Sequence, residues 1–344
     1  AVSRSFPARP NMARGEEIAR LLKGEIVQVV GCTEPAAIAY AFRTLIRHMP
    51  VPPPPNSFCA CLHVSRDAFR NASTAVVPFL KKPGILAAAA AGCASRTNDF
   101  NVFADFDLRL ARKFMKNGAW LRAVPVRRNG LYVALQFNAD TGIILRGRHD
   151  HIEQLVVFGR DLTPRQKLMP RPPRLDEIFE LARARHPALE ALALDFITRQ
   201  VPPEKGYSLE DQIVRRIAGR MAGYSHPVMT ITGSGNQGIF LGLPYRRLYQ
   251  EQGAAILPAV VFSLLAQVHL SHKHDRLSRD CGLATKAAPA LAAGLAFARG
   301  AAPADIRRLF RDVPSRIGGL PCEGAEPACG DKARRAFQAV WNGA

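Results

Sequence analysis

No apolar run in the 344-residue sequence reaches the ~18 residues that a helix needs to cross a bilayer. The alanine-rich runs at 86–91 and 287–296 are shorter and only weakly apolar. The chain begins AVSRSFPARPNM, which lacks the apolar stretch of a secretory signal, and Met12 is a candidate natural start. We therefore expect a cytoplasmic protein with no membrane partner.

Acidic residues are the scarcer charge, because 28 Asp and Glu stand against 47 Lys and Arg, for a formal net charge of +19. Such an excess makes nucleic acid a partner to consider. The basic residues are spread along the chain, however, with only short clusters such as 122–128 and 146–148. No helix-turn-helix, zinc-finger or RNA-recognition pattern is present to direct them. The sequence therefore argues against a nucleic-acid partner.

Cysteine is present seven times, and an odd number argues against a complete disulfide framework of a secreted protein. In a cytoplasmic chain the alternatives are buried apolar thiols, catalytic thiols and metal ligands. Cys59, Cys61 and Cys93 lie in no motif, and we interpret them as core or interface thiols.

Helical and β-type patterns alternate along the chain. Apolar residues recur at helical spacing over 16–30, and further helical stretches run over about 35–48 and 83–91. Helical patterns return after the proline-rich stretch 170–173. Between them lie short β-prone runs separated by turn signals, namely 58–64, 120–126, 131–137, 142–145 and 154–158.

A prior of about 150 residues per domain suggests roughly two structural units. Hydrophobic residues make up 48% of the chain, which is enough for a sizeable core. We predict an α+β fold with a mainly helical body, formed by residues 1–56 and 165–344. A small antiparallel-sheet α+β unit, residues 57–164, is inserted between these two segments.

Four segments rich in small and polar residues interrupt the helices: Gly31-Cys-Thr-Glu-Pro35, Gly233-Ser-Gly-Asn-Gln-Gly238, Asp280-Cys-Gly282 and Cys322-Glu-Gly-Ala-Glu-Pro-Ala-Cys329. In the first, Pro35 favours the first turn of a helix and Thr33 is a good capping residue. Cys32 is then at a helix N-terminus, where the dipole stabilises a thiolate and lowers its pKa. A buried cysteine at a tight turn is the alternative.

The glycine-rich segment 233–238 precedes an apolar run that can open a helix, and amides in such a loop bind a phosphate or carboxylate. It is neither a P-loop nor a dinucleotide fingerprint, and a turn made for close packing is the alternative. Cys322 and Cys329, with Cys281, are able to hold an iron–sulfur cluster or zinc. Their spacing matches neither a zinc ribbon nor a ferredoxin, and buried cysteines are the alternative.

In their order, these four segments are similar to the L-cysteine desulfidase family, which is related to the α chain of iron–sulfur L-serine dehydratases. The family pattern runs GCTEP, SGSGNQG, CG and CDGAKxxCxxK. This chain reads VGCTEP, TGSGNQG, RLSRDCG and CEGAEPACGDK, so that the spacing within each motif is kept. The similarity covers most of the chain, and the four motifs together are specific although each alone is not.

The resemblance implies a [4Fe–4S] cluster on Cys281, Cys322 and Cys329, with the fourth iron open as a Lewis acid. It implies that Cys32 is the base that removes the α-proton of a small amino acid, or else a resting ligand of the fourth iron. Further site residues that it implies are Glu34 for catalysis and, for substrate binding, Thr33, Asn71, Ser234, Gly235, Asn236 and Gln237.

The activity implied is β-elimination from L-cysteine to sulfide, ammonia and pyruvate. A serine or other hydroxy-amino-acid ammonia-lyase is one alternative, because only the leaving group differs. A non-catalytic iron–sulfur sensor or partner-binding protein is another, and a homo-oligomer is an open alternative. Lys332 and a histidine at 149 or 151 also resemble family positions, but we favour a solvated lysine and a surface histidine as their interpretations.

The chain departs from the family in one stretch. Where the family reads roughly SPNIYKNGMGVGIPGT, this chain has residues 65–82, in which Ser65, Asn71 and Pro78 survive. Ala72, Thr74, Val76 and Phe79 replace glycines, and we expect these bulkier residues to close or reshape the substrate space. Glu326 replaces the lysine of CDGAK, which reverses a charge beside the cluster.

Overall fold

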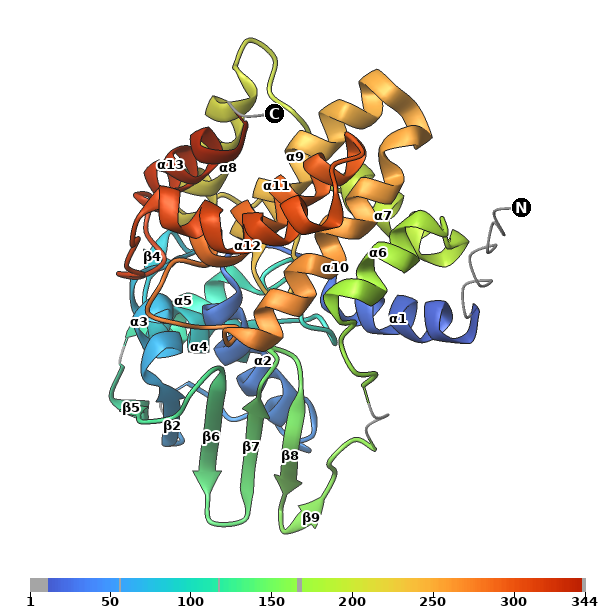
Figure 1. The fold of residues 1–344 in the computed structure, drawn as a ribbon. Coiled ribbons are helices and arrows are strands. Elements are labelled where there is room, and N and C mark those ends of the chain that lie inside the picture. Colours follow the sequence, from blue (N-terminus) through green and yellow to red (C-terminus); the bar gives the residue numbers. More distant parts are fainter. Residues whose placement is uncertain (1–11, 56, 117, 166–168, 342–344) are drawn as a thin grey trace, which may run out of the picture.

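The computed structural model describes residues 12–55, 57–116, 118–165 and 169–341 (Figure 1). Helices form the upper part of the molecule in this view, and the strands of a sheet extend below them. The predicted α+β class is confirmed. Residues 1–11, which hold the predicted extension before Met12, lie outside the described residues.

Helices from both ends of the chain share one buried apolar cluster, in which α10 contacts α6, α7 and α11. One helical stretch of this part, Gly235–Lys273, is long and apolar enough to cross a membrane, but 72% of its apolar window is buried inside the molecule. The elements of this part are α1 (Met12–Glu25), α6 (Leu175–Arg183), α7 (Pro187–Thr198), α8 (Leu209–Met221), α9 (Gly235–Gln252), η2 (Gly253–Ile256), α10 (Leu257–Lys273), the π-turn η3 (Leu283–Ala287), α11 (Ala288–Ala298), α12 (Pro303–Ile317) and α13 (Cys329–Trp341).

A six-stranded sheet and its covering helices form the second part, with strand order β5-β2-β6-β7-β8-β9. The strands are β2 (Ala60–Ser65), β5 (Leu121–Val126), β6 (Tyr132–Asn138), β7 (Thr141–Arg146), β8 (Ile152–Val157) and β9 (Arg160–Asp161). The helices are α2 (Thr33–Arg47), α3 (Arg66–Thr74), α4 (Ile85–Ala94), α5 (Leu108–Lys116) and η1 (Gly118–Trp120).

The sheet is mixed, which corrects the antiparallel prediction. Strand β5 pairs parallel with β2, whereas the other neighbours in the sheet are antiparallel. The physical reason is the crossover through α3, α4 and α5, which returns the chain to the starting end of β2.

Helix α2 packs with the sheet part, although the sequence assigned it to the helical body. The buried residues pass from one apolar cluster to the other between Val29 and Val30. A Cβ on Gly92 of α4 would overlap the Ala39 carbonyl oxygen of α2, so the backbones of these two helices lie in direct contact. The division at residues 56 and 165 stays a prediction.

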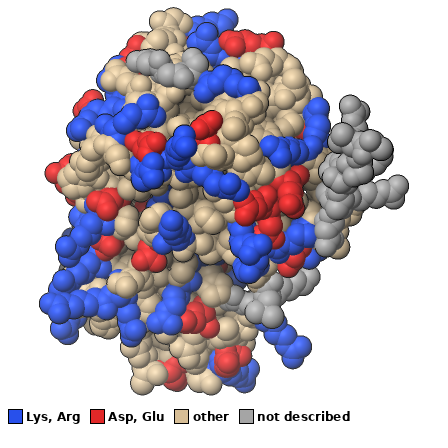
Figure 2. Space-filling view, viewed as in Figure 1, with Lys and Arg blue, Asp and Glu red and all other residues tan. Residues whose placement is uncertain are grey.

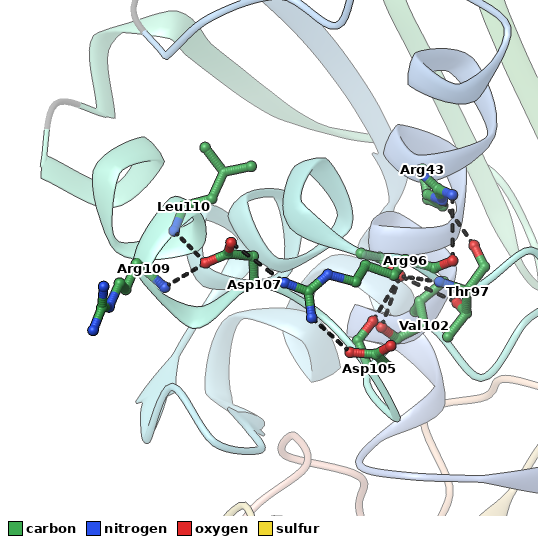
Figure 3. Close-up of polar contacts among 9 residues, drawn as sticks. Arg43, Arg96, Thr97, Val102, Asp105, Asp107, Arg109 and Leu110 are labelled. Atoms are coloured by element: carbon green, nitrogen blue, oxygen red, sulfur yellow. Dashed lines mark hydrogen bonds and ion pairs between the residues drawn. The ribbon is translucent and has the colours of Figure 1, made fainter.

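Polar contacts fix the loop between α4 and α5, and Arg43 of α2 reaches this loop (Figure 3). The Arg96 guanidinium lies between the carboxylates of Asp105 and Asp107, at 3.3 and 3.4 Å. Asp107 also accepts from the backbone N–H groups two and three residues later, at 2.9 Å each, and thus caps α5. In the same loop, Asn101 Oδ1 accepts from the Val30 N–H at 2.8 Å. The turn that carries Cys32 is therefore hydrogen-bonded, through Val30 and Asn101, to a loop that has its own ion pairs.

Candidate active site

The four motif segments line one cavity of about 100 Å³. Every residue that the sequence singled out for the cluster, catalysis or substrate is on its wall, except Gly235. The structure therefore brings these residues together, while their roles stay predictions. The wall also includes Arg220, Met221, Thr232, Gly233, His149, Arg276, Leu277, Ser278, Asp280, Gly282, Leu283, Gly324 and Ala325.

A two-stranded pairing brings the first two segments side by side. Strand β1 (Gln28–Val29) is antiparallel to β10 (Val228–Met229), and residues that follow each of these strands line the cavity. Gly31 has φ +76°, and a Cβ there would lie 2.8 Å from the Pro78 ring. Both the left-handed backbone and the lack of space require glycine before Cys32.

Cys32 is the N-cap of α2, as predicted, and it is only 3% exposed. Its Sγ–H donates to Glu34 Oε2 at 3.0 Å, and the Thr33 hydroxyl donates to the same oxygen at 3.1 Å. Asn71 Nδ2 donates to Glu34 Oε1 at 3.3 Å. His149 Nε2 lies 3.8 Å from that oxygen, in ion-pair range but beyond a hydrogen bond. Glu34 is thus the centre of the polar network.

The pKa values in this network correct one prediction. Burial raises the pKa of the Cys32 thiol well above its ordinary value, the charge of Glu34 raises it further, and Arg220 only partly opposes this. The lowered pKa expected from the helix dipole is therefore wrong. Burial alone would also raise the pKa of Glu34, but the nearby His149, together with the Cys32 hydrogen bond, lowers it to about 2. Cys32 is a thiol donor here, and Glu34 is an ionised acceptor.

The two candidate histidines differ in position. His149 is 5% exposed, lines the cavity, and has no hydrogen-bond partner on either ring nitrogen. A Cβ on Gly233 would lie 2.6 Å from its ring Cε1, so the imidazole packs on the glycine-rich turn. His151 is partly exposed, and its Nδ1 lies 2.9 Å from the Arg146 carbonyl, outside the cavity. Only His149 is therefore placed to act in the site.

Two of the three candidate cluster cysteines, Cys281 and Cys322, lie on segments that are paired by backbone hydrogen bonds, and the third lies at the start of a helix. The Cys281 N–H donates to the Leu320 carbonyl at 2.7 Å, and the Cys322 N–H to the Arg279 carbonyl at 2.6 Å. Cys329 begins α13. Burial raises the pKa of Cys281 to about 11, and the nearby thiols of Cys329 and Cys322 add to that rise. The three thiols are therefore close enough to interact electrostatically.

Among the residues that the structure describes, no group of three or more His, Cys, Asp and Glu side chains is arranged to hold a metal ion. A zinc site needs its ligands about 2.3 Å from one point. In a [4Fe–4S] cluster each cysteine binds a different iron, so the sulfur atoms stand farther apart. Three free thiols around one cavity fit such a cluster better than a single ion.

Two lysines lie near these cysteines. Lys332 Nζ donates to the Pro321 carbonyl at 2.7 Å and to Glu323 at 2.9 Å, so it braces the segment before Cys322. Lys286, in the π-turn after Cys281, is 1% exposed and donates to the carbonyls of Asp275 and Arg276. Burial lowers the pKa of Lys286 to about 8. The apolar sequence around Lys286 gave no signal that this lysine is buried and bonds these two carbonyls.

The glycine-rich segment is a closely packed helix cap, as one of the two interpretations predicted, and anion binding by it stays a prediction. Ser234 is the N-cap of α9 and accepts from the Gln237 N–H at 3.4 Å. A Cβ on Gly238 would overlap the Met229 carbonyl oxygen, so this glycine is required for packing. The Gln237 side-chain oxygen accepts from Gln267, and its nitrogen lies against Gly282. Gln237 therefore joins the loop to the Cys281 segment.

The stretch that departs from the family pattern does not fill the cavity. None of the four side chains that replace glycines is on the cavity wall, and the expectation that they close or reshape the substrate space stays a prediction. Phe79 keeps a left-handed φ of +63° and is 45% exposed. Thr74 Oγ1 accepts from the Ala325 N–H at 2.9 Å. Asn71 Oδ1 lies 3.7 Å from Cys322 Sγ, so this stretch contacts the cysteine segment directly.

Sequence reasoning missed two arginines on the cavity wall. Arg276 forms a two-pronged ion pair with Glu25, at 2.6 and 2.7 Å, and both residues are largely buried. Arg220, near the end of α8, is 4% exposed. Each lies within five residues of other basic residues and in a sequence resembles an ordinary surface cation.

Comparison with known proteins gives the kinship of the chain. Residues 194–344, which include the glycine-rich segment and the three cysteines, match the family described as serine dehydratase alpha chain. A UPF0597 protein of Caldanaerobacter subterraneus subsp. tengcongensis is 23% identical over 91% of this chain and 83% of its own. UPF0597 proteins of Kosmotoga olearia and Clostridium botulinum are 25% and 26% identical, over 95% and 92% of this chain and 87% and 83% of theirs.

Residues 194–344 are similar to the serine dehydratase alpha chain, in agreement with the predicted kinship. More particularly, the chain is similar over most of its length to the UPF0597 proteins. The kinship is with lyases that act on amino acids. The part of the site that holds Cys32, Glu34, Asn71 and His149 lies outside the matched serine dehydratase region.

Proposed function

We propose that this protein is a cytoplasmic iron–sulfur lyase that catalyses β-elimination from a small amino acid, with L-cysteine as the first candidate. The observation that carries the proposal is the single cavity shared by three free cysteines and the Cys32–Glu34 pair. An elimination needs both features, because one group must remove the α-proton and another must stabilise the leaving group.

Cys281, Cys322 and Cys329 would hold a [4Fe–4S] cluster. When bound, the cluster supplies a Lewis acid that stabilises the departing sulfide or hydroxide. The remaining requirements fall to the residues of this chain.

The network around Glu34 handles the proton. Burial and Glu34 raise the pKa of Cys32, so its thiolate, once formed, is a strong base that suits a weakly acidic α-proton. The Cys32 Sγ–H donates to Glu34 Oε2 at 3.0 Å, and His149 Nε2 lies 3.8 Å from the other carboxylate oxygen, Oε1. Loss of the α-proton and of hydrosulfide (HS⁻), which together make hydrogen sulfide, converts L-cysteine to 2-aminoacrylate, which tautomerises to the imine. Water then releases ammonia and pyruvate.

L-Serine is the second candidate substrate, and the match to the serine dehydratase alpha chain favours it. The proton-handling residues serve both reactions equally, because the substrates share the α-carbon and differ only in the leaving group. A substrate panel of L-cysteine, L-serine and L-threonine therefore decides between them.

The test combines cofactor content and turnover in anaerobically purified protein. We expect about four irons per chain with matching acid-labile sulfide, and pyruvate release from at least one member of the panel. Cys322→Ala should lose iron and turnover together, whereas Cys59→Ala, an exposed thiol outside the cavity, should keep both. An intact cluster with no product from any substrate would favour a sensor or partner-binding protein. No iron even after reconstitution would overturn the proposal.

A further inference from the structure

Arg220 is a buried cation without an anionic partner. Its Nη1 donates to Asn236 Oδ1 at 2.9 Å, but Nε and Nη2 are buried with no hydrogen-bond partner. Among the described residues, no Asp or Glu forms an ion pair with it. A buried guanidinium with two unsatisfied nitrogens is costly unless an anion completes it.

A second group of donors lies against the same guanidinium. Gly235 is the first residue of the 18-residue helix α9, and a Cβ there would lie 2.5 Å from Arg220 Cζ. The first intrahelical bond of α9 runs from the Gly238 N–H to the Ser234 carbonyl, so the N–H groups of Gly235 and Asn236 precede it. A helix N-terminus favours negative charge. Because Gly235 has no side chain, the Arg220 guanidinium is able to lie directly against the N-terminus of α9.

The free nitrogens identify the shape of the anion. Nε and Nη2 form one edge of the guanidinium, and their parallel N–H groups match the two oxygens of a carboxylate. Arg220 lines the same cavity as Cys32 and the three cysteines, and the volume of about 100 Å³ suits a small molecule. Arg220 also borders a neighbouring cavity of about 290 Å³ beside α8, so an anion can approach it from two sides.

We propose that Arg220 binds the α-carboxylate of the amino-acid substrate through Nε and Nη2, with Asn236 as the residue that positions it and the first turn of α9 as a second donor. This inference rests on the proposed function and adds a specificity-determining residue to it. It assigns the Asn236 carbonyl oxygen to Arg220, and it requires a free carboxylate on the ligand.

The experiment measures binding rather than turnover. L-Alanine has no leaving group, and L-alaninamide keeps the ammonium and the methyl group but lacks the carboxylate. Calorimetric titration of the full chain should show that the wild type binds L-alanine more tightly than L-alaninamide. Arg220→Gln should weaken L-alanine binding roughly 10- to 100-fold, since a hydrogen-bonded charge is lost, and leave L-alaninamide binding unchanged.

Two further variants keep the test valid if Arg220→Gln folds poorly. Gly235→Ala should displace the guanidinium and weaken L-alanine binding without removing the charge. Arg215→Gln is the matched control, because this arginine is on the same helix, is 51% exposed, pairs with Glu204 and borders only the neighbouring cavity, not the one that Cys32 lines. It should bind both probes as the wild type does.

The inference is overturned if Arg220→Gln binds L-alanine as well as the wild type, or if it loses both probes equally, as expected for an arginine that only balances the charge of the cysteines. It is also overturned if the wild type does not discriminate between the probes. Carboxylate-selective binding without pyruvate release from any substrate would sink the lyase proposal and keep Arg220 as an anion-binding residue.

Discussion

At the scale of single residues, the Cys32–Glu34 pair determines what the site is able to do. Two groups that are both buried share one hydrogen bond, and the charge stays on Glu34 because His149, Thr33 and Asn71 surround it. The thiol therefore keeps its proton until the carboxylate is neutralised or the proton moves on. A helix N-terminus alone does not make a reactive thiolate when a carboxylate lies 3.0 Å away.

Removing the charge of Glu34 should lower the pKa of Cys32. Glu34→Gln keeps an oxygen acceptor but ends the electrostatic repulsion, so the pH midpoint of Cys32 alkylation should fall by roughly one unit or more. Iodoacetamide labelling between pH 7 and pH 11, followed by peptide mass spectrometry, measures it. Cys59, which is exposed and outside the cavity, serves as the internal control and should not shift. An unchanged Cys32 midpoint would show that burial alone sets its pKa.

The sequence identifies the cavity residues that lie in unusual local surroundings. Cys32, the glycine-rich segment and the three later cysteines are visible because small residues interrupt helical patterns there. Arg220 is not visible, and His149 is indicated only by the resemblance, because the burial of each depends on contacts with distant segments. The pKa of Cys32 was mispredicted for the same reason, since burial and the geometry of Glu34 appear only in three dimensions.

At the scale of elements, the contact between α2 and α4 fixes the position of Cys32. A Cβ on Gly92 would lie 2.7 Å from Ala39 Cα, and the alanines of α4 are fully buried beside it. Helices that approach this closely need small residues on the facing side. Because α2 begins at the cysteine turn, a shift of α2 moves the N-cap residue within the cavity.

Gly92→Val should therefore destabilise the fold and disturb the site. Overpacking in a close-packed core typically costs about 1–3 kcal/mol, and we expect the variant to lie at or above the upper end because the clash is with backbone. Urea unfolding gives the free energy change, and Gly319→Ala is the control, since its Cβ would meet nothing within 4 Å and its φ is ordinary. A Gly92→Val protein as stable as the wild type would mean that α2 and α4 separate without cost.

The periodic helices were predictable, and the sheet topology was not. Predicted helices at 16–30, 35–48 and 83–91 correspond to α1, α2 and α4 within a few residues. Helices α3 and α5 were missed, as they are nine residues each and lie in polar stretches. The direction of β5 depends on the crossover formed by those helices, so local alternation carries no information about it.

At the scale of the whole molecule, charged side chains are spread over the visible surface, whereas the candidate site residues are gathered around one cavity. Figure 2 shows Lys and Arg side chains over the visible face with Asp and Glu among them, in keeping with many exposed ion pairs. The cavity instead lies where the helical and sheet parts meet. Cys32, Ala75, Met221 and Ala325 form a small apolar cluster of their own at this junction.

A ligand in the cavity should therefore stabilise both parts together. Reconstitution with iron and sulfide links Cys281 to the segment that runs from Cys322 to Cys329. Asn71 and Thr74 of α3 contact Cys322 and Ala325 of that segment. We expect the thermal midpoint to rise by roughly 5–15 °C, since the binding energy adds to the folding energy. Cys322→Ala should show no such rise under the same treatment.

Hydrogen exchange locates the effect. Amide protection should increase in residues 320–332 and also in α3 and the turn around Cys32, because Ala325 N–H, Thr74 and Asn71 connect them. Strands β8 and β9, which contribute nothing to the cavity wall, should exchange as before. Protection confined to the C-terminal segments would mean that the sheet part joins the site only when substrate is present. In that case the proton-handling residues and the cysteines would be coupled by the ligand rather than by the fold.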